Sequence, residues 1–382
     1  MTRTVETPTP PEARRAWRKV RAPLLRWYDA NRRDLPWRRT HDPYAIWISE
    51  AMLQQTRVET VIPYWERFLE TFPDVESLAE AELDDVYAVW TGLGYYSRAR
   101  NLKHAAETVV RDHGSKLPDT ADGLQTLKGI GRYTAGAIAS IAFDREAPLV
   151  DGNVIRVFAR LLGIREDSAG KAVQERMWTA AEDLVQGPRP GDLNQALMEL
   201  GATLCTPRQP HCLACPVRRH CDAHAAGDAE TLPIKRKKAK QTRLRAVAAC
   251  LERKGKILAV RRPESGLMAG LWELPGGPLE PGEEAKDRIG AVLHEAIGLE
   301  ILDAEPIGQV EHLFTHRRLE LEIFRCRIAP GGRVRRNGFV AHRWVAPSAL
   351  LDLAHAGSTR KAMVLLGLTD EQSARAAGKR AR

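Results

Sequence analysis

The spacing of apolar residues along the chain changes character near residue 222. Before that point apolar residues recur mainly at helical intervals. In GNVIRVFARLLG, residues 152–163, they fall on one face, and Gly163 can end the helix. In DPYAIWISEAMLQQT, residues 42–56, Asp42 can cap a helix whose first residue is Pro43. The pattern predicts an all-α region that extends to residue 221.

Beyond residue 242 the pattern becomes that of strands. AVAACLE and ILAVRR flank a turn at RKGK and predict a hairpin, and RRLELEIFRCRI predicts a further strand. The connecting residues 222–242 are polar, and seven basic residues without an acid lie between Lys235 and Arg245. We therefore expect an unpacked basic linker over 222–242, an α+β domain over 243–368 and a disordered tail over 369–382.

The composition of the chain indicates which kind of partner and which cellular location to expect. The chain has 382 residues, with 58 Lys and Arg against 49 Asp and Glu, so its formal charge of +9 favours an anionic partner. No apolar run reaches the roughly 18 residues that span a bilayer, and a membrane role is not expected. The start MTRTVETPTPPEARRAW has no apolar segment of the signal-peptide type, which predicts a cytoplasmic, nucleoid-associated protein.

Four of the six cysteines form a cluster, Cys205, Cys212, Cys215 and Cys221, separated by six, two and five residues. Four thiolates this close can enclose one metal centre, and by spacing alone either zinc or an iron-sulfur cluster is possible. The spacing resembles the [4Fe-4S] loop of the endonuclease III superfamily of DNA glycosylases. Arg208 lies in this loop, as a candidate phosphate contact or a solvated surface residue.

The stretch LKGIGRYTAGA, residues 127–137, is typical of a tight turn between two helices. Gly129 and Gly131 permit the turn, and the free N–H groups at the following helix start offer a phosphate site. Taken alone, the motif is more often a helical hairpin without a ligand, and Lys128 is either a phosphate contact or solvated. In the same superfamily a helix-hairpin-helix is followed by a Gly/Pro-rich loop and a required aspartate, which LVDGNV supplies as Asp151.

Two carboxylates have the properties of an acid and a charge stabiliser. Asp151 begins a helix, where the dipole and the free N–H groups should keep it ionised. The alternative is that Asp151 is an ordinary N-cap residue without a catalytic role. Glu50 interrupts a mainly apolar helical stripe, so its pKa should be raised, unless it lies at the edge of the stripe and faces water. A protonated acid beside an ionised one is the pairing that breaks glycosidic bonds.

The segments WISEAMLQQTRVETVIPYW, GLGYYSRARNL, VDGNVIRV and NQALMELGA resemble the MutY adenine DNA glycosylases, and the resemblance covers about residues 20–365. It implies that Glu50 protonates the adenine at N7, that Asp151 stabilises the oxocarbenium ion and that Asn153 orients Asp151. It also implies a six-helix barrel over about 36–140 and an iron-sulfur cluster domain from about 12–35 and 141–221.

The same resemblance assigns contacts with DNA. Arg38 and Glu199 would contact the extruded adenine, Trp37 and Leu53 would line its pocket or belong to the core, and Gln55 and Tyr95 would wedge into the duplex. Bifunctional members carry a lysine where this chain has Tyr133. Because a phenol cannot form the Schiff base that leads to strand cleavage, the resemblance implies a monofunctional enzyme.

The C-terminal segment LWELPGGPLEPGEEAKDRIGAVLHEAIGL resembles the Nudix segment of MutT-like domains. Counted from Gly277, the Arg-Glu positions hold Ala291 and Val292, and Glu295 is followed by Ala296, so nucleotide hydrolysis is not expected. In MutY proteins this domain reads 8-oxoguanine with a loop of Phe, Ser and His. The matching residues here are Phe314, Thr315 and His316.

The sequence thus predicts an all-α helix-hairpin-helix glycosylase with an iron-sulfur cluster loop, followed by an α+β Nudix-like domain. Its expected activity is base excision repair of adenine opposite 8-oxoguanine, or opposite G, in double-stranded DNA, by a monomer. Two alternatives remain: a thymine-mismatch glycosylase, against which the MutT-like domain argues, and a non-catalytic lesion-binding protein, against which the intact Glu50 and Asp151 argue.

Overall fold

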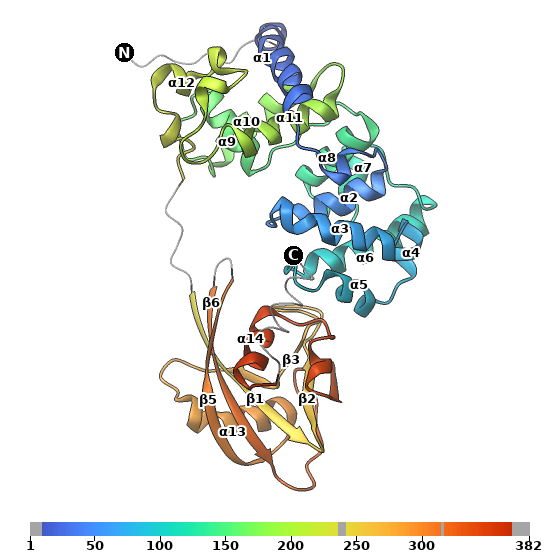
Figure 1. Ribbon diagram of the computed structural model, residues 1–382, viewed down its shortest axis with the longest axis vertical. Coiled ribbons are helices and arrows are strands. Elements are labelled where there is room, and N and C mark those ends of the chain that lie inside the picture. Colours follow the sequence, from blue (N-terminus) through green and yellow to red (C-terminus); the bar gives the residue numbers. More distant parts are fainter. Residues whose placement is uncertain (1–9, 236–241, 315–316, 369–382) are drawn as a thin grey trace. The chain divides into compact units, whose positions relative to one another are not determined.

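The computed structural model describes residues 10–235, 242–314 and 317–368, and it has helices before residue 235 and a mixed sheet after it (Figure 1). The helices of the first part are α1 (Pro10–Asn31), α2 (Pro43–Leu53), α3 (Val58–Thr71), α4 (Val75–Glu80), α5 (Leu83–Trp90), α6 (Ser97–His113), α7 (Ala121–Gln125), α8 (Arg132–Phe143), α9 (Gly152–Leu161), α10 (Lys171–Val185), α11 (Pro190–Thr203) and α12 (Asp222–Ala226). Short 3-10 turns lie at Pro36–Arg38, Cys212–Ala214, Arg218–His220 and Ala229–Thr231. The predicted fold class is confirmed.

The strands and helices of the second part are β1 (Thr242–Arg253), β2 (Lys256–Arg261), β3 (Trp272–Glu273), β4 (Gly276–Pro278), α13 (Ala285–Ile297), β5 (Ile301–Leu313), β6 (Arg317–Ile328), β7 (Ala341–Val345), a 3-10 turn at Ser348–Leu350, and α14 (Gly357–Leu365). The sheet order is β3-β2-β1-β6-β5, with β4 on β1 and β7 on β2. Strands β1 and β6 are parallel, and the other pairs are antiparallel.

The chain divides into two compact units whose boundary does not follow the change from helices to strands. One unit comprises Met1–Gln55, Asp74–Ala79 and His104–Lys238, and the other comprises Thr56–Pro73, Glu80–Lys103 and Ala239–Arg382. The second unit therefore joins α3, α5 and the start of α6 to the C-terminal sheet. Among the described residues, no helix is both long and apolar enough to cross a membrane.

In the first unit, small residues let helix α8 approach its neighbours closely. Helix α8 packs against both α2 and α11, and α9 packs against α11. Gly136 of α8 lies so close to the chain after it that an added Cβ would be 1.9 Å from the carbonyl oxygen of Pro148. Gly191 of α11 is also crowded, because a Cβ added there would be 2.4 Å from Ser140 O of α8. The contact at Gly136 places α8 directly against Pro148, in the segment that leads to Asp151.

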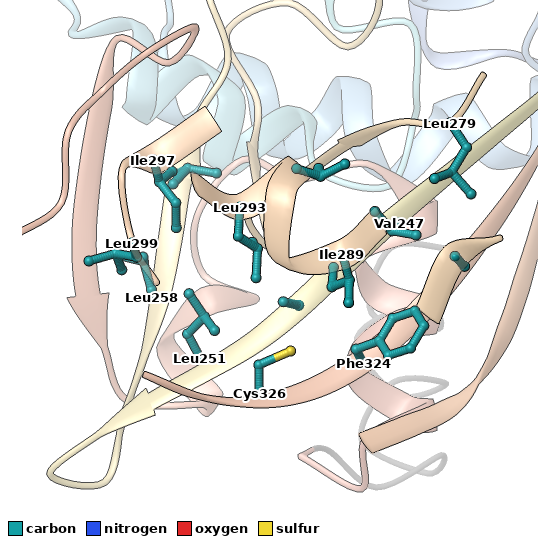
Figure 2. Close-up of a cluster of buried hydrophobic side chains, with 14 residues drawn as sticks. Val247, Leu251, Leu258, Leu279, Ile289, Leu293, Ile297, Leu299, Phe324 and Cys326 are labelled. Atoms are coloured by element: carbon teal, nitrogen blue, oxygen red, sulfur yellow. The ribbon is translucent and has the colours of Figure 1, made fainter. Parts of the chain in front are cut away.

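In the second unit, the period-two pattern of strand β1 places apolar side chains on both faces of the sheet. Val247, Ala249 and Leu251 face α13 in the cluster of Figure 2, and they pack with Ile289, Leu293 and Ile297 of that helix. The alternate residues Ala248 and Cys250 pack with Met363 of α14. A helix thus covers each face, which explains why β1 lacks a polar side in its centre.

The hairpin between β1 and β2 forms where the sequence predicts it. Glu252 pairs with Ile257 and Arg253 with Lys256, across the turn residues Lys254 and Gly255. Both turn residues have positive φ, 51° and 71°, as a two-residue hairpin turn of this hand requires.

The predicted start of the linker at residue 222 is wrong. Residues 222–235 continue the folded unit, because Ala223, Ala229 and Leu232 are buried together against Cys212 and Cys221. Leu232 O also accepts a hydrogen bond from the Arg160 side chain at 3.1 Å. The basic residues that motivated the linker lie mainly at 236–241, outside the described residues, as does the predicted tail at 369–382.

Candidate active site

Glu50 lies on α2, a helix that is buried along most of its length. The carboxylate of Asp42 caps it by accepting from the N–H groups of Tyr44 and Ala45, at 3.1 and 3.2 Å, and Pro43 follows the cap. Every residue from Tyr44 to Met52 is buried, and Glu50 is 4 % exposed. Burial, supported by the negative charge of Asp151, raises the pKa of Glu50 to about 7. The predicted pKa shift is therefore confirmed.

Tyr133, the second residue of α8, is a hydrogen-bond partner of this acid. Its hydroxyl donates to Glu50 Oε2 at 2.8 Å and lies 3.4 Å from Met198 Sδ. Burial and the two nearby carboxylates raise the pKa of Tyr133 well above its usual value, so the phenol keeps its proton as a donor. The sequence predicts only that an amine is absent here; it gives no signal for this contact between residues 83 positions apart.

Asp151 caps α9, as predicted from its position. The N–H of Val154 donates to Oδ1 at 2.7 Å and the side-chain amide of Asn153 donates to Oδ2 at 2.9 Å, so the contact needed for Asn153 to orient Asp151 is present. Burial outweighs these hydrogen bonds and raises the pKa of Asp151, because the helix start is enclosed by protein rather than by water.

Arg156, one turn further along α9, connects Asn153 to the cysteine loop. Its Nη2 donates to Asn153 Oδ1 at 2.9 Å and to Gly201 O at 2.6 Å, and its Nε donates to Cys205 O at 2.6 Å. Sequence reasoning missed this residue. The available signal is that Arg156 and Arg160 are charged positions on a helix that is otherwise buried and apolar, where an unpaired charge would be costly.

Glu199 and Arg38, predicted to contact the extruded base, form an ion pair with each other. Glu199 on α11 is completely buried; it accepts from Arg38 Nη2 at 2.8 Å and from Arg33 Nε and Nη2, both at 2.8 Å. Burial alone would raise the pKa of Glu199, but the hydrogen bonds from Arg33 and Arg38 outweigh it and lower the pKa to about 2. Arg33 is a site residue that the sequence analysis missed.

Arg38 also links this ion pair to Glu50, because its positive charge lowers the pKa of Glu50. The structure thus brings Glu50, Tyr133 and Asp151 together, with Arg38 and Glu199 within electrostatic range. Trp37 is buried and Leu53 is partly buried, and either position fits a pocket wall or the core.

The residues predicted to enter or grip the duplex are exposed and include unusual backbone conformations. Gln55 and Tyr95 have φ of 59° and 50°, in the left-handed region that residues other than glycine rarely adopt. In the hairpin turn Lys128, Gly129 and Gly131 are exposed. Gly129 has φ 86° and needs to be glycine, whereas Gly131 has φ −89°, so the predicted need for backbone freedom holds only at Gly129.

The four clustered cysteines all line one small cavity with mainly apolar walls. Arg160 reaches into this region and places Nη1 3.2 Å from Cys205 Sγ and 2.7 Å from Thr206 O. Arg208 is exposed on the loop. Within the described ranges, no group of three or more His, Cys, Asp or Glu side chains is arranged as a site for a metal ion.

In the C-terminal domain, the acidic residues left from the Nudix pattern are paired with an arginine. Arg288 lies 2.9 Å from Glu283 and 3.5 Å from Glu295, and Val292 is buried in the core where the pattern would need a glutamate. Phe314 directly follows strand β5, and its ring meets that of His312 edge-on at 4.7 Å. Thr315 and His316, the other predicted lesion-reading residues, lie outside the described residues.

Comparison with known proteins agrees with this organisation. Residues 48–183 match the model of the HhH-GPD superfamily of base excision DNA repair proteins, and residues 246–364 match the NUDIX domain model. A solved thermostable thymine-DNA glycosylase shares the fold of the first part, with 29 % identity and a TM-score of 0.52 over 56 % of this chain and 98 % of its own.

Relatives across both domains are adenine DNA glycosylases. The protein of Rattus norvegicus is 41 % identical over 79 % of this chain and 69 % of its own length. That of Schizosaccharomyces pombe is 33 % identical over 93 % of this chain and 89 % of its own length. With a buried acid, a capped aspartate and both domains in this order, the chain belongs to the adenine DNA glycosylases, base excision repair enzymes that hydrolyse the N-glycosyl bond of adenine in DNA.

Proposed function

We propose that this glycosylase removes adenine opposite 8-oxoguanine, and opposite G, in duplex DNA, and that it leaves the strand intact at the resulting abasic site. The observation that carries the proposal is the pairing of Glu50, whose pKa is about 7, with Asp151 in one buried site. An acid with this pKa is partly protonated at neutral pH and can give its proton to a leaving base.

In this mechanism adenine is extruded from the duplex and Glu50 protonates its N7. The bond between the base and the sugar then breaks, and the positive charge that develops on the sugar is stabilised by the carboxylate of Asp151, which Asn153 holds in place. Water attacks the sugar and gives one proton to the carboxylate of Glu50, which leaves a neutral abasic site and restores the acid. The proposal is supported by the hydrogen bonds to both oxygens of Asp151, which fix the direction of its negative charge.

Monofunctional hydrolysis follows from the chemistry of Tyr133. A Schiff base requires a nucleophilic amine next to the sugar, and the group at this position is a phenol whose raised pKa keeps it protonated. Tyr133 instead orients the acid, because its hydroxyl donates a hydrogen bond to the carboxylate of Glu50.

Extrusion of the base is supported by the positions of the candidate wedge residues. Gln55 is exposed and Tyr95 is 47 % exposed, although both backbones are in a conformation that costs about 1 kcal/mol or more in a residue with a side chain. Unstacking a base costs a few kcal/mol, and an inserted side chain offsets part of this cost.

A [4Fe-4S] cluster is the group that Cys205, Cys212, Cys215 and Cys221 would hold. All four thiols line the same cavity, and a guanidinium from Arg160 reaches one of them, as expected where thiolate charge has to be neutralised. When bound, the cluster supplies a structural centre for the loop that carries Arg208.

One experiment separates this proposal from its alternatives. The protein is incubated with duplexes containing A opposite 8-oxoguanine, A opposite G, T opposite G, or normal pairs, and each reaction is analysed with and without alkaline treatment. We expect strand breaks only after alkali, and only with the two adenine mispairs. Excision of thymine, or breaks before alkali, would contradict the proposal; binding to the lesion without any excision would support a non-catalytic protein.

A further inference from the structure

The turn that carries Tyr95 also carries a residue that faces the C-terminal domain. The turn lies between α5 and α6 and is built from three positive φ angles, at Gly92 (105°), Gly94 (70°) and Tyr95 (50°). Tyr95 is about half exposed, whereas the adjacent Tyr96 is only 8 % exposed. Two neighbouring tyrosines therefore occupy different environments, and only the first is available to DNA.

Tyr96 is bonded to a segment more than 250 residues further along the chain. Its hydroxyl donates to His355 O at 3.1 Å, and its ring meets that of Tyr87 edge-on at 5.4 Å. The acceptor is held firmly, since Trp272 N donates to the neighbouring carbonyl of Ala354 at 2.8 Å. His355 itself is buried. The hydrogen bond thus joins the turn to the edge of the C-terminal sheet within one compact unit.

Charged residues make a second and a third link between the same two segments. Asp84 on α5 lies 3.3 Å from Arg261 at the end of β2. Arg100 on α6 lies 3.7 Å from Glu264. These links flank the turn in the sequence, so α5, the turn and the start of α6 are all tied to residues 261–355.

The two sides meet around a cavity of about 660 Å³. Tyr95 and Arg100 line it from the helical side, and Met268, His312 and Phe314 line it from the C-terminal domain. The residue predicted to wedge into the duplex and the described residue of the predicted lesion-reading loop therefore border the same space.

We propose that Tyr96, supported by the Asp84–Arg261 ion pair, is a positioning residue that sets the selectivity for the base opposite adenine. It holds the turn against His355, and this contact fixes the distance between Tyr95 and Phe314 across the cavity. This inference rests on the proposed function, because it assumes that the opposite base is read at this cavity.

The test compares Tyr96→Phe with Tyr64→Phe in the full-length protein. Tyr64→Phe is a control for loosening of the turn alone: its hydroxyl donates at 2.9 Å to the backbone oxygen of Thr91, which precedes the turn and lines the same cavity, and its loss leaves the bond to His355 in place. The readout is the ratio of single-turnover excision rates for A opposite 8-oxoguanine and A opposite G. We expect Tyr96→Phe to lower this ratio about three- to tenfold, as one lost hydrogen bond allows, and Tyr64→Phe to leave it within about twofold.

A charge exchange tests the supporting ion pair. Asp84→Arg and Arg261→Asp should each lower the ratio, and the double variant should restore it at least in part, because the opposite charges face each other again. An unchanged ratio in Tyr96→Phe, an equal fall in Tyr64→Phe, or single and double charge variants that behave additively would each overturn the proposal.

Amide hydrogen exchange keeps the contact testable apart from catalysis. Tyr96→Phe should speed exchange in both residues 92–100 and residues 353–357, whereas Tyr64→Phe should speed it only in the helical segment. If the unmodified protein excises no adenine, the proposed function fails while the exchange result still decides whether Tyr96 ties the turn to His355. If exchange at residues 353–357 is unchanged in Tyr96→Phe, the proposal that Tyr96 holds the turn against His355 is wrong.

Discussion

The hydroxyl of Tyr133 and the carboxylate of Glu50 form a 2.8 Å hydrogen bond that joins the helix-hairpin-helix to the buried acid. The bond stabilises the ionised form of Glu50 and so lowers its pKa, against the burial that raises it. Tyr133, which cannot form a Schiff base, therefore also sets the pKa of Glu50.

Removing this bond should move the pH dependence of excision to higher pH. In the unmodified protein the rate should fall as the pH rises through about 7, because Glu50 must be protonated to act. In Tyr133→Phe the pKa of Glu50 should be higher, so the variant should retain a larger share of its own maximal rate at pH 8. Single-turnover rates from pH 5 to 9 measure this shift. Tyr64→Phe should show the unmodified profile, and a shift of Tyr133→Phe to lower pH would refute the account.

Glu50→Gln should stabilise the folded protein at alkaline pH while it abolishes excision. The folded-state pKa of Glu50 is raised, so its contribution to stability is complete below its unfolded pKa and is lost as the pH rises through about 7. The neutral glutamine avoids this loss, which we expect to be on the order of 1–3 kcal/mol at pH 8. Denaturant unfolding at pH 5 and pH 8 measures it. If the difference in unfolding free energy between Glu50→Gln and the unmodified protein is the same at pH 5 and pH 8, Glu50 does not have a raised pKa in the folded protein.

Arg156→Gln should impair both the cysteine loop and excision. The substitution leaves Gly201 O and Cys205 O without their donor and frees Asn153 Oδ1. We expect a loss of about 2–4 kcal/mol in unfolding free energy and a fall of at least tenfold in the excision rate. Arg176→Gln, which removes only an exposed pair with Glu166, is the control and should change neither measurement. Normal excision by Arg156→Gln would remove this residue from the support of Asp151.

Gly136→Ala should displace the segment that precedes Asp151. The added Cβ would be 1.9 Å from Pro148 O, a backbone atom that cannot rotate away. We expect a loss of at least about 2 kcal/mol, as for other overpacked sites, measured by thermal unfolding. Gly152→Ala is a matched control at the start of α9, because nothing lies within 4 Å of its added Cβ. Equal stability of the two variants would show that α8 and this segment can separate at little cost.

The sequence predicted those features whose causes are local. The cap at Asp42, the end of α9 and the hairpin between β1 and β2 depend on residues within a few positions of one another, and all three are present. The raised pKa of Glu50 was also predictable, since a carboxylate in an apolar helical stripe is buried wherever that stripe packs.

The missed features depend on partners that are distant in the sequence. Arg33 meets Glu199 across 166 positions, and Arg156 meets Cys205 across 49, and no periodic pattern pairs such residues. The start of the linker was misplaced for the same reason. Leu232 follows a polar stretch, and its burial becomes evident only when the cysteine loop provides the surface against which it packs.

The left-handed backbones of Gln55 and Tyr95 have a consequence for the balance between stability and activity. Glycine would adopt the same φ angles of 59° and 50° without the penalty that a Cβ brings, so a chain selected only for stability would place glycine at both positions. The protein instead keeps two large side chains in strained positions. The proposed insertion of these two side chains into the duplex would account for this cost, and the unbound protein would then be less stable than its fold permits.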